Sequence, residues 1–140
     1  MTDESTLRGL QVFGEMMGEK AKAAMGAGLD GQGFASDIAN LACEFAFDKV
    51  WGREGLERKH RSLVVIGVLI AQRQVSELKN HIRIALNNGL TVSEIEEALI
   101  QTLPYVGFPA IASATSVIIE TLREQGIDTS TRTAEEKGLL

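Results

Sequence analysis

The stretch "VSELKNHIRIALNNG", residues 75–89, decides the fold class because its apolar residues recur every three or four positions. These residues share one face of a helix: Val75, Leu78, Ile82, Ala85 and Leu86. Gly89 stands where helices commonly end in a left-handed cap. We therefore expect an amphipathic helix from about Val75 to Asn88, with this face packed on a core.

The segments on either side of this helix are also helical in pattern. The run "SLVVIGVLIA", residues 62–71, carries no charge and is about half the roughly 20 residues of a membrane span, which favours a buried helix. Thr91 followed by Glu94 is typical of a capping box at a helix start. Residues 103–110, "LPYVGFPA", are interpreted as a turn, and Pro109 as the first residue of a last helix that runs to about Gln125.

The first third of the chain predicts two more helices. One apolar series, Leu7, Leu10, Phe13 and Met17, indicates a single helix that leads into a glycine-rich loop at residues 26–33. The next, from Phe34 to Trp51, is apolar nearly all round, and its acidic residues share one narrow sector: Asp37, Glu44 and Asp48. Such a helix is deeply packed or lies in a subunit interface.

The sequence thus predicts an all-α fold of about six helices, with a single domain over residues 1–125 and a frayed, polar tail over 126–140. Composition limits the function. The formal net charge is −5 and the basic residues are scattered, which argues against nucleic-acid or anionic-membrane partners. The one cysteine, Cys43, excludes an intrachain disulfide and any C-x-x-C motif, so we expect a cytoplasmic protein. The first ten residues are acidic and no apolar run follows them, so we expect no export signal.

Candidate chemistry lies on a second face of the 75–88 helix, which carries Gln74, Glu77, His81 and Asn88. Glu77 and His81 are four residues apart, so their side chains can meet. This pair is either an exposed ion pair or a proton-transfer dyad in which the carboxylate orients the imidazole and raises its pKa, and spacing alone leaves both open.

Other candidates carry two interpretations each. Trp51 and Arg53 are either packing plus surface charge, or a substrate wall and a carboxylate clamp. His60 is better explained as a solvated or capping residue, and Cys43 as a small core or interface residue. Two histidines with dispersed carboxylates predict no metal site, and the glycine patterns of phosphate and dinucleotide sites are absent, so no cofactor is expected.

Five motifs together resemble the carboxymuconolactone decarboxylase family, which shares its fold with the alkylhydroperoxidase D proteins. They are W-x-R-x-G-L (51–56), R-S-L (61–63), E-L-K-x-H (77–81), N-N-G (87–89) and Y-x-G-x-P (105–109). The resemblance covers roughly residues 34–125. It implies an all-helical subunit in a ring-shaped homo-oligomer, typically a homohexamer built as a trimer of dimers. The peroxidase branch has C-x-x-C where this chain has Gln74 and Glu77, so thiol peroxidase chemistry is excluded.

The resemblance also implies an activity. Decarboxylases of the family act on 4-carboxymuconolactone in protocatechuate degradation, without a metal or organic cofactor. Carried over to this chain, the resemblance implies that His81 transfers the proton and that Glu77 orients the imidazole of His81. Substrate binding would fall to Arg53, with Arg61 as a second anion partner, and to an aromatic wall that excludes water: Trp51, Tyr105 and Phe108.

Departures from the family pattern leave the substrate open. They stand next to the motif tryptophan and in the last turn: Phe47, Asp48, Glu54 and Ser113. Two alternatives therefore remain beside a lyase for a carboxylated lactone. One is a related isomerase or hydrolase for another small acid, and the other is a non-enzymatic oligomeric binding protein on the same scaffold.

Overall fold

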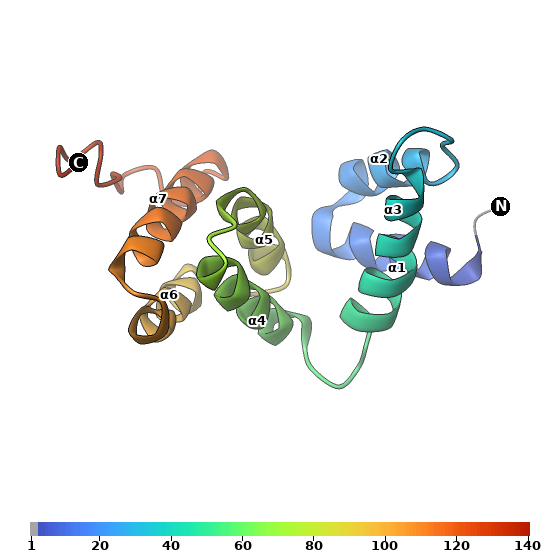
Figure 1. Ribbon diagram of the computed structural model, residues 1–140, viewed down its shortest axis with the longest axis horizontal. Helices are drawn as coiled ribbons and strands as arrows, with labels where there is room; N and C mark the ends of the chain where they lie inside the picture. The colour runs from blue at the N-terminus through green and yellow to red at the C-terminus, as the bar shows by residue number, and fades with distance from the viewer. Residues whose placement is uncertain (1–2) are drawn as a thin grey trace. The chain divides into compact units, whose positions relative to one another are not determined.

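The computed structural model describes residues 3–140, and every regular element in that range is helical (Figure 1). The elements are α1 (Glu4–Met17), α2 (Glu19–Leu29), α3 (Ser36–Leu41), the π-helix η1 (Ala42–Trp51), α4 (Arg58–Ala71), α5 (Val75–Asn87), α6 (Val92–Val106) and α7 (Phe108–Glu124). The all-α prediction is therefore confirmed for the described residues. The chain forms two compact units, one ending at Arg58 and one running from Lys59 to Leu140, and each is described by itself.

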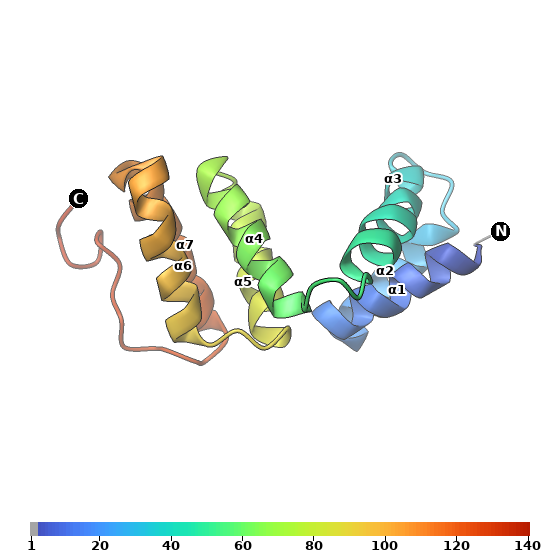
Figure 2. The same cartoon turned by 90° about the horizontal axis from the view of Figure 1, so that it is seen from below.

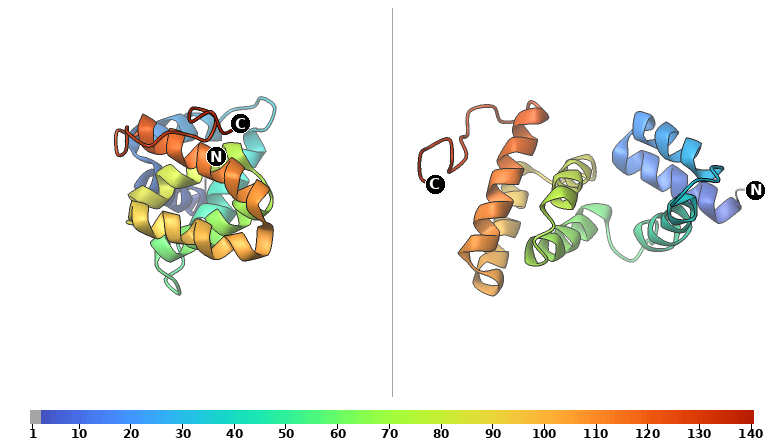
Figure 3. Two further views of the ribbon diagram at one scale, coloured as in Figure 1. Left: turned by 90° about the vertical axis from the view of Figure 1, so that its left-hand side faces the viewer. Right: turned by 45° about the horizontal axis from the view of Figure 1, so that its top comes forward.

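In the first unit, α1 packs against both η1 and α2, and α3 joins α2 to η1 (Figure 3). The contact between α1 and η1 is close because it forms at a glycine: a Cβ on Gly9 would lie 1.7 Å from the carbonyl oxygen of Cys43. Cys43, at this contact, and Met16 of α1 are fully buried. Phe13 and Phe47 meet edge to face with ring centroids 5.0 Å apart. The helices are thus held by a small apolar core of their own.

The N-terminal region contains two helices where the sequence predicts one helix and a loop. The chain breaks at Gly18, whose φ of 96° is a left-handed conformation that favours glycine. Helix α2 then continues through the glycine-rich stretch to Leu29, which is buried. A glycine inside a helix is destabilising by only about 1 kcal/mol relative to alanine, so packing outweighs it. The expectation of a loop from residue 26 was therefore wrong.

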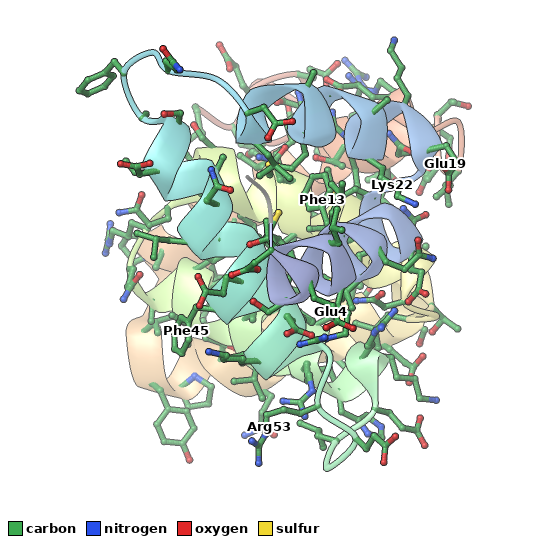
Figure 4. All side chains as sticks on the ribbon, turned by 90° about the vertical axis from the view of Figure 1, so that its right-hand side faces the viewer. Glu4, Phe13, Glu19, Lys22, Phe45 and Arg53 are labelled. Atoms are coloured by element: carbon green, nitrogen blue, oxygen red, sulfur yellow. The ribbon has the colours of Figure 1, made fainter. Side chains whose placement is uncertain are left out.

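The segment predicted as one helix from Phe34 to Trp51 is helical from Ser36 onward, but its longer part is a π-helix. The amide of Gly52 still donates to the carbonyl of Phe47 with the i→i+5 spacing. The apolar residues that share its outer face are exposed: Ile38 (65%), Leu41 (60%) and Phe45 (63%). Phe45 projects away from the helix in Figure 4. This helix is therefore not packed all round within its own unit.

The second unit has one apolar core to which all four of its helices contribute. Its buried members are Ile66 and Ile70 of α4, Leu78, Ile82 and Ala85 of α5, Leu90, Ile95 and Leu99 of the α6 region, and Ala114, Ile118 and Leu122 of α7. Helix α4 is buried on one face only, since Val64 and Val68 on its other face are 61% and 46% exposed. The prediction of a central buried helix at residues 62–71 is thus half correct.

The predicted boundaries of α5 and α6 are largely confirmed. Gly89 follows the end of α5 with a φ of 102°, as its cap position requires. Thr91 and Glu94 form both hydrogen bonds of a capping box, at 3.1 and 3.0 Å. However, α6 continues through Pro104 to Val106, and the chain turns only at Gly107, with a φ of 86°. The turn predicted over residues 103–110 is therefore shorter than expected, because only Gly107 lies between α6 and α7.

The tail after α7 is not helical, but it is hydrogen-bonded rather than frayed. Arg123 near the end of α7 donates to the carboxylate of Glu136 at 2.8 Å. That carboxylate also accepts from the backbone amide of Thr133 at 2.9 Å. The tail leaves the end of α7 and doubles back beside it (Figures 1 and 2). These contacts join the 133–136 part of the tail to the end of α7.

Candidate active site

Helix α5 carries the candidate dyad, and its own packing fixes which face that dyad occupies. Leu78 and Ile82 are 1% and 0% exposed, so the apolar face predicted from the sequence is buried in the core. Glu77 and His81 each directly precede one of these residues in the chain, and they lie one helical turn apart. Glu77 is exposed and His81 is half buried. The pair therefore sits at the edge of the core, with the carboxylate on the water side.

The pKa of His81 depends on two opposing effects. Burial lowers the pKa of His81 below its usual value near 6.5, and the charge of Glu77 acts in the opposite direction with a smaller effect. Glu77 thus raises the pKa of His81, as the sequence interpretation expects, but burial outweighs it and the net pKa is lowered. Burial dominates because Glu77 is in contact with solvent, which screens its charge. The imidazole is therefore mainly neutral at pH 7.

The other two polar residues of this face differ in environment. Gln74 is exposed and precedes α5 as its N-cap residue, without a side-chain capping bond. Asn88 is half buried, and its side-chain amide donates to the hydroxyl of Ser62 at 3.0 Å. Ser62 lies on α4 and is only 1% exposed. This bond couples α4 to the end of α5, and sequence reasoning did not find it because Ser62 lies in an otherwise apolar run.

Ion pairs anchor α5 to α7 beside the dyad. Lys79 and Arg83 approach the two carboxylate oxygens of Glu124, at 2.7 and 3.1 Å. These bonds, that from Lys79 first, hold the pKa of Glu124 below its usual range. The sequence shows two basic residues four apart on α5, but their partner lies more than 40 positions away. Their effect is to limit rotation of the helix that carries His81.

Trp51 and Arg53 belong to the first unit. Trp51 is the last residue of η1 and is 8% exposed, so its ring is buried. Arg53 follows in the connecting turn, and its exposed side chain points outward in Figure 4. Asp48, one of the departures from the family pattern, accepts two hydrogen bonds from Arg8 of α1, both at 3.2 Å. This departure therefore has a structural role within the first unit.

The remaining predicted binding residues lie in the second unit. Arg61 is half buried near the start of α4. Tyr105 and Phe108 flank the turn between α6 and α7 and are 82% and 74% exposed. Within the second unit these two rings face solvent, so a role in excluding water stays a prediction. His60 is exposed at the start of α4, in accord with its interpretation as a solvated residue.

Two cavities in the second unit lie away from the dyad. One, of about 330 Å³, lies between α6, α7 and the tail, and the other, of about 460 Å³, is lined by Leu63 of α4 and by mainly polar residues of α6. Neither has Glu77 or His81 in its lining. Among residues 3–140, no three acidic, histidine or cysteine side chains gather in a way that could hold a metal ion. No described helix is both long and apolar enough to span a membrane.

Comparison with known proteins supports the family resemblance. The model of the carboxymuconolactone decarboxylase family matches residues 36–120. A 4-carboxymuconolactone decarboxylase of Acinetobacter baylyi is 38% identical over 91% of this chain and 94% of its own. A nitrosuccinic acid decarboxylase of Metarhizium robertsii is 42% identical over 60% of this chain and 59% of its own. An uncharacterised 15.0 kDa protein of Paracoccus denitrificans is 37% identical over 53% of this chain and 57% of its own.

Proposed function

Because the chain belongs to the carboxymuconolactone decarboxylase family, we propose that it is a cofactor-free decarboxylase of 4-carboxymuconolactone or a similar carboxylated lactone. The observation that carries the proposal is the 38% identity, over nearly the whole of both chains, to a protein of that name. The placement of Glu77 and His81 on one polar face of α5, at the edge of the core, supports it. Aromatic-acid degradation in the cytoplasm is the setting that this substrate implies.

In the proposed reaction, the bond from the ring carbon to the carboxylate breaks and carbon dioxide leaves. The electron pair stays on the substrate and delocalises onto the lactone carbonyl oxygen, so the substrate serves as its own electron sink. A proton from the His81 imidazolium then adds to the ring carbon, and His81 regains a proton from solvent. Glu77 orients the ring of His81 and favours its charged form. Arg53, with Arg61, binds carboxylates of the substrate.

The lowered pKa of His81 has a consequence for this scheme. The free protein holds a mainly neutral imidazole, which cannot donate a proton to carbon. A bound anionic substrate would favour the imidazolium, because an opposite charge within about 4–6 Å raises the pKa of a histidine. Substrate binding would thus charge the acid that the reaction needs. The expected sign is that kcat/KM falls as the pH rises through a value below 6.5.

The test compares the two histidines of the chain. Loss of 4-carboxymuconolactone absorbance is followed with wild-type protein, His81→Gln and the matched control His60→Gln. We expect His81→Gln to lose about 10²–10⁴-fold in kcat, the usual contribution of general acid–base catalysis, while His60→Gln keeps the wild-type rate. Light scattering and an unfolding curve verify that each variant is assembled and folded. A folded His81→Gln protein with full activity would sink the mechanism.

Arg53 and Arg61 are tested by whether their variants lose catalytic efficiency through a higher KM or through a lower kcat. Replacing either arginine with glutamine removes a charged clamp but keeps a polar side chain, so we expect a higher KM. Arg132 of the tail, as Arg132→Gln, is the control for loss of one positive charge. An unchanged KM in Arg53→Gln would contradict its assignment as the carboxylate clamp.

The relative from Metarhizium robertsii favours a second candidate substrate. Its name records decarboxylation of nitrosuccinic acid, and a nitro group can accept the electron pair as a lactone carbonyl does. The departures from the family pattern at Phe47, Glu54 and Ser113 are compatible with such a change of substrate. Carbon dioxide release from nitrosuccinate, measured beside release from 4-carboxymuconolactone, ranks the two. The isomerase or hydrolase alternative predicts that substrate is converted without release of carbon dioxide. The binding-protein alternative predicts that no substrate is converted.

We also propose that the subunits form a ring-shaped homohexamer, as a trimer of dimers. The exposed apolar face of Ile38, Leu41 and Phe45 supports self-association, because contiguous apolar patches commonly mark interfaces. Light scattering on the purified protein measures the mass. A Phe45→Glu variant should shift that mass downward. A wild-type protein that is monomeric at micromolar concentration would contradict the proposal.

A further inference from the structure

The cavity of about 330 Å³ in the second unit is built mainly from apolar side chains of α6 and α7. These two helices lie side by side, and the tail doubles back next to them (Figures 1 and 2). The main apolar lining comes from Ile95, Leu99, Leu103, Ile111, Ile118 and Leu122. The volume lies at the lower end of the range of small-molecule sites, about 300–1,000 Å³. A six- to eight-carbon compound is of suitable size.

The charged groups of the lining are all acidic. Glu96 of α6 and Asp128 of the tail line the cavity, and no lysine, arginine or histidine does. Hydrogen bonds from Thr131 and Ser130 hold the pKa of Asp128 far below its usual range, so this carboxylate is charged at neutral pH. An anion entering an apolar space beside two carboxylates would lose its hydration without gaining a partner. The cavity therefore disfavours anionic molecules.

The tail holds Asp128 and Thr131 in place at this cavity. The carboxylate of Asp128 accepts from the backbone amides of Ser130 and Thr131, at 2.9 and 3.0 Å. Arg123 of α7 donates to the carbonyl of Thr131 at 3.0 Å. These hydrogen bonds fix Asp128 and Thr131 next to α7. The cavity therefore has polar groups in a defined position, with which a ligand can interact. An apolar body with few placed polar groups is the usual make-up of a small-molecule site.

From this combination we propose that the cavity between α6, α7 and the tail is a second binding site, which takes a small apolar molecule with a cationic or neutral hydrogen-bond-donating end. The site differs in charge preference from the site proposed for the reaction, whose substrate is an anion. None of the residues assigned to that reaction lines this cavity. A hydrophobic amine can occupy it without competing for the proton-transfer pair.

The charge preference is tested with three compounds of equal chain length: hexylamine, 1-hexanol and hexanoate. The melting temperature of the whole protein is followed at pH 7 over millimolar concentrations of each, since a ligand that binds the folded state raises it. We expect the largest rise with hexylamine, a smaller one with 1-hexanol and none with hexanoate. The double variant Glu96→Gln, Asp128→Asn should remove the advantage of hexylamine over 1-hexanol. An equal or larger rise with hexanoate would overturn the proposal.

The location is tested by filling the cavity. Thr115 of α7 lines it, is half buried and donates to its own helix at the carbonyl of Ile111, so Thr115→Phe adds bulk without breaking a tertiary hydrogen bond. Thr102 of α6 is a matched control, because it is half buried, donates to the carbonyl of Ala98 and lines the other cavity. We expect Thr115→Phe to abolish the hexylamine response and Thr102→Phe to keep it.

Two outcomes would overturn this assignment. If Thr115→Phe still responds to hexylamine as the wild-type protein does, the compound binds elsewhere. If no compound raises the melting temperature, the proposal is wrong, and loss of assembly by Thr115→Phe in light scattering would then identify the cavity as an interface between copies of the chain. Neither outcome depends on catalytic activity, so the result is independent of the proposed reaction.

Discussion

Replacing Glu77 with glutamine tests whether this carboxylate acts on His81 through its charge. Glu77 is exposed and lies one turn before the half-buried imidazole, so the pair resembles a partly solvated i,i+4 ion pair. Such pairs contribute about 0.3–0.5 kcal/mol, and about 1.36 kcal/mol corresponds to a change of one in pKa. The Glu77→Gln variant should therefore lower the pKa of His81 further, by about 0.2–0.4.

The assay is an NMR titration of the His81 ring in a His60→Gln background, in which His81 is the one remaining histidine. Glu97→Gln on α6 removes the same net charge from an exposed position and serves as the control, with no expected change in the pKa of His81. Unfolding curves accompany the titration, because Glu77 also stabilises the first turn of α5.

The result that would refute the reasoning is a pKa of His81 that stays constant or rises when the carboxylate is removed. A wild-type pKa above 6.5 would refute the dominance of burial as well. If the titration gives the expected decrease and decarboxylase activity is unchanged, Glu77 acts on the charge of His81 without a role in the rate-limiting step.

Three further predictions concern stability. Ile82→Ala empties a fully buried position of α5 and should lower the free energy of unfolding in urea by about 2–5 kcal/mol; a loss below about 1 kcal/mol would contradict its core position. Thr91→Ala removes the capping box and should lower it by about 0.5–2 kcal/mol, with recovery in Thr91→Ser. Hydrogen bonds from Arg123 lower the pKa of Glu136 to about 2, so its stabilising effect is complete above about 4.5 and is lost as the pH falls toward 2; Glu136→Gln should flatten that part of the stability curve.

Local signals in the sequence predicted the parts of the fold that local physics controls. The capping box at Thr91 and the end of α5 at Gly89 depend on residues within one turn, and both are confirmed. The break at Gly18 and the continuation of α6 through Pro104 were not predicted, because the effects of both residues depend on context. Gly18 takes a left-handed φ that composition does not reveal, and α6 continues through Pro104 although this residue has no N–H for a helical hydrogen bond. Each error concerned where a helix is broken, not whether one forms.

The candidate site also has features that local sequence predicts and features that it does not. Helical spacing sufficed to place Glu77 and His81 on one face of α5, beside the buried Leu78 and Ile82. The pKa direction of His81 could not be predicted, because it depends on how deeply the ring is buried. The bond from Asn88 to Ser62 joins positions 26 residues apart, and no local pattern announces it. Long-range contacts of this kind appear only when the helices are packed.

The π-helical form of η1 bears on how this chain tolerates insertion and deletion. A turn closed by i→i+5 bonds holds one residue more than a turn of α-helix, so η1 stores additional chain length between Ala42 and Trp51. Deleting a single residue there could be absorbed by a return to α-helix while α1 and α3 keep their places. The same deletion would turn Trp51 to a new direction relative to Cys43. A length change of one residue in this segment would therefore change the direction of the tryptophan of the W-x-R-x-G-L motif, and the side chains around that buried ring would have to repack.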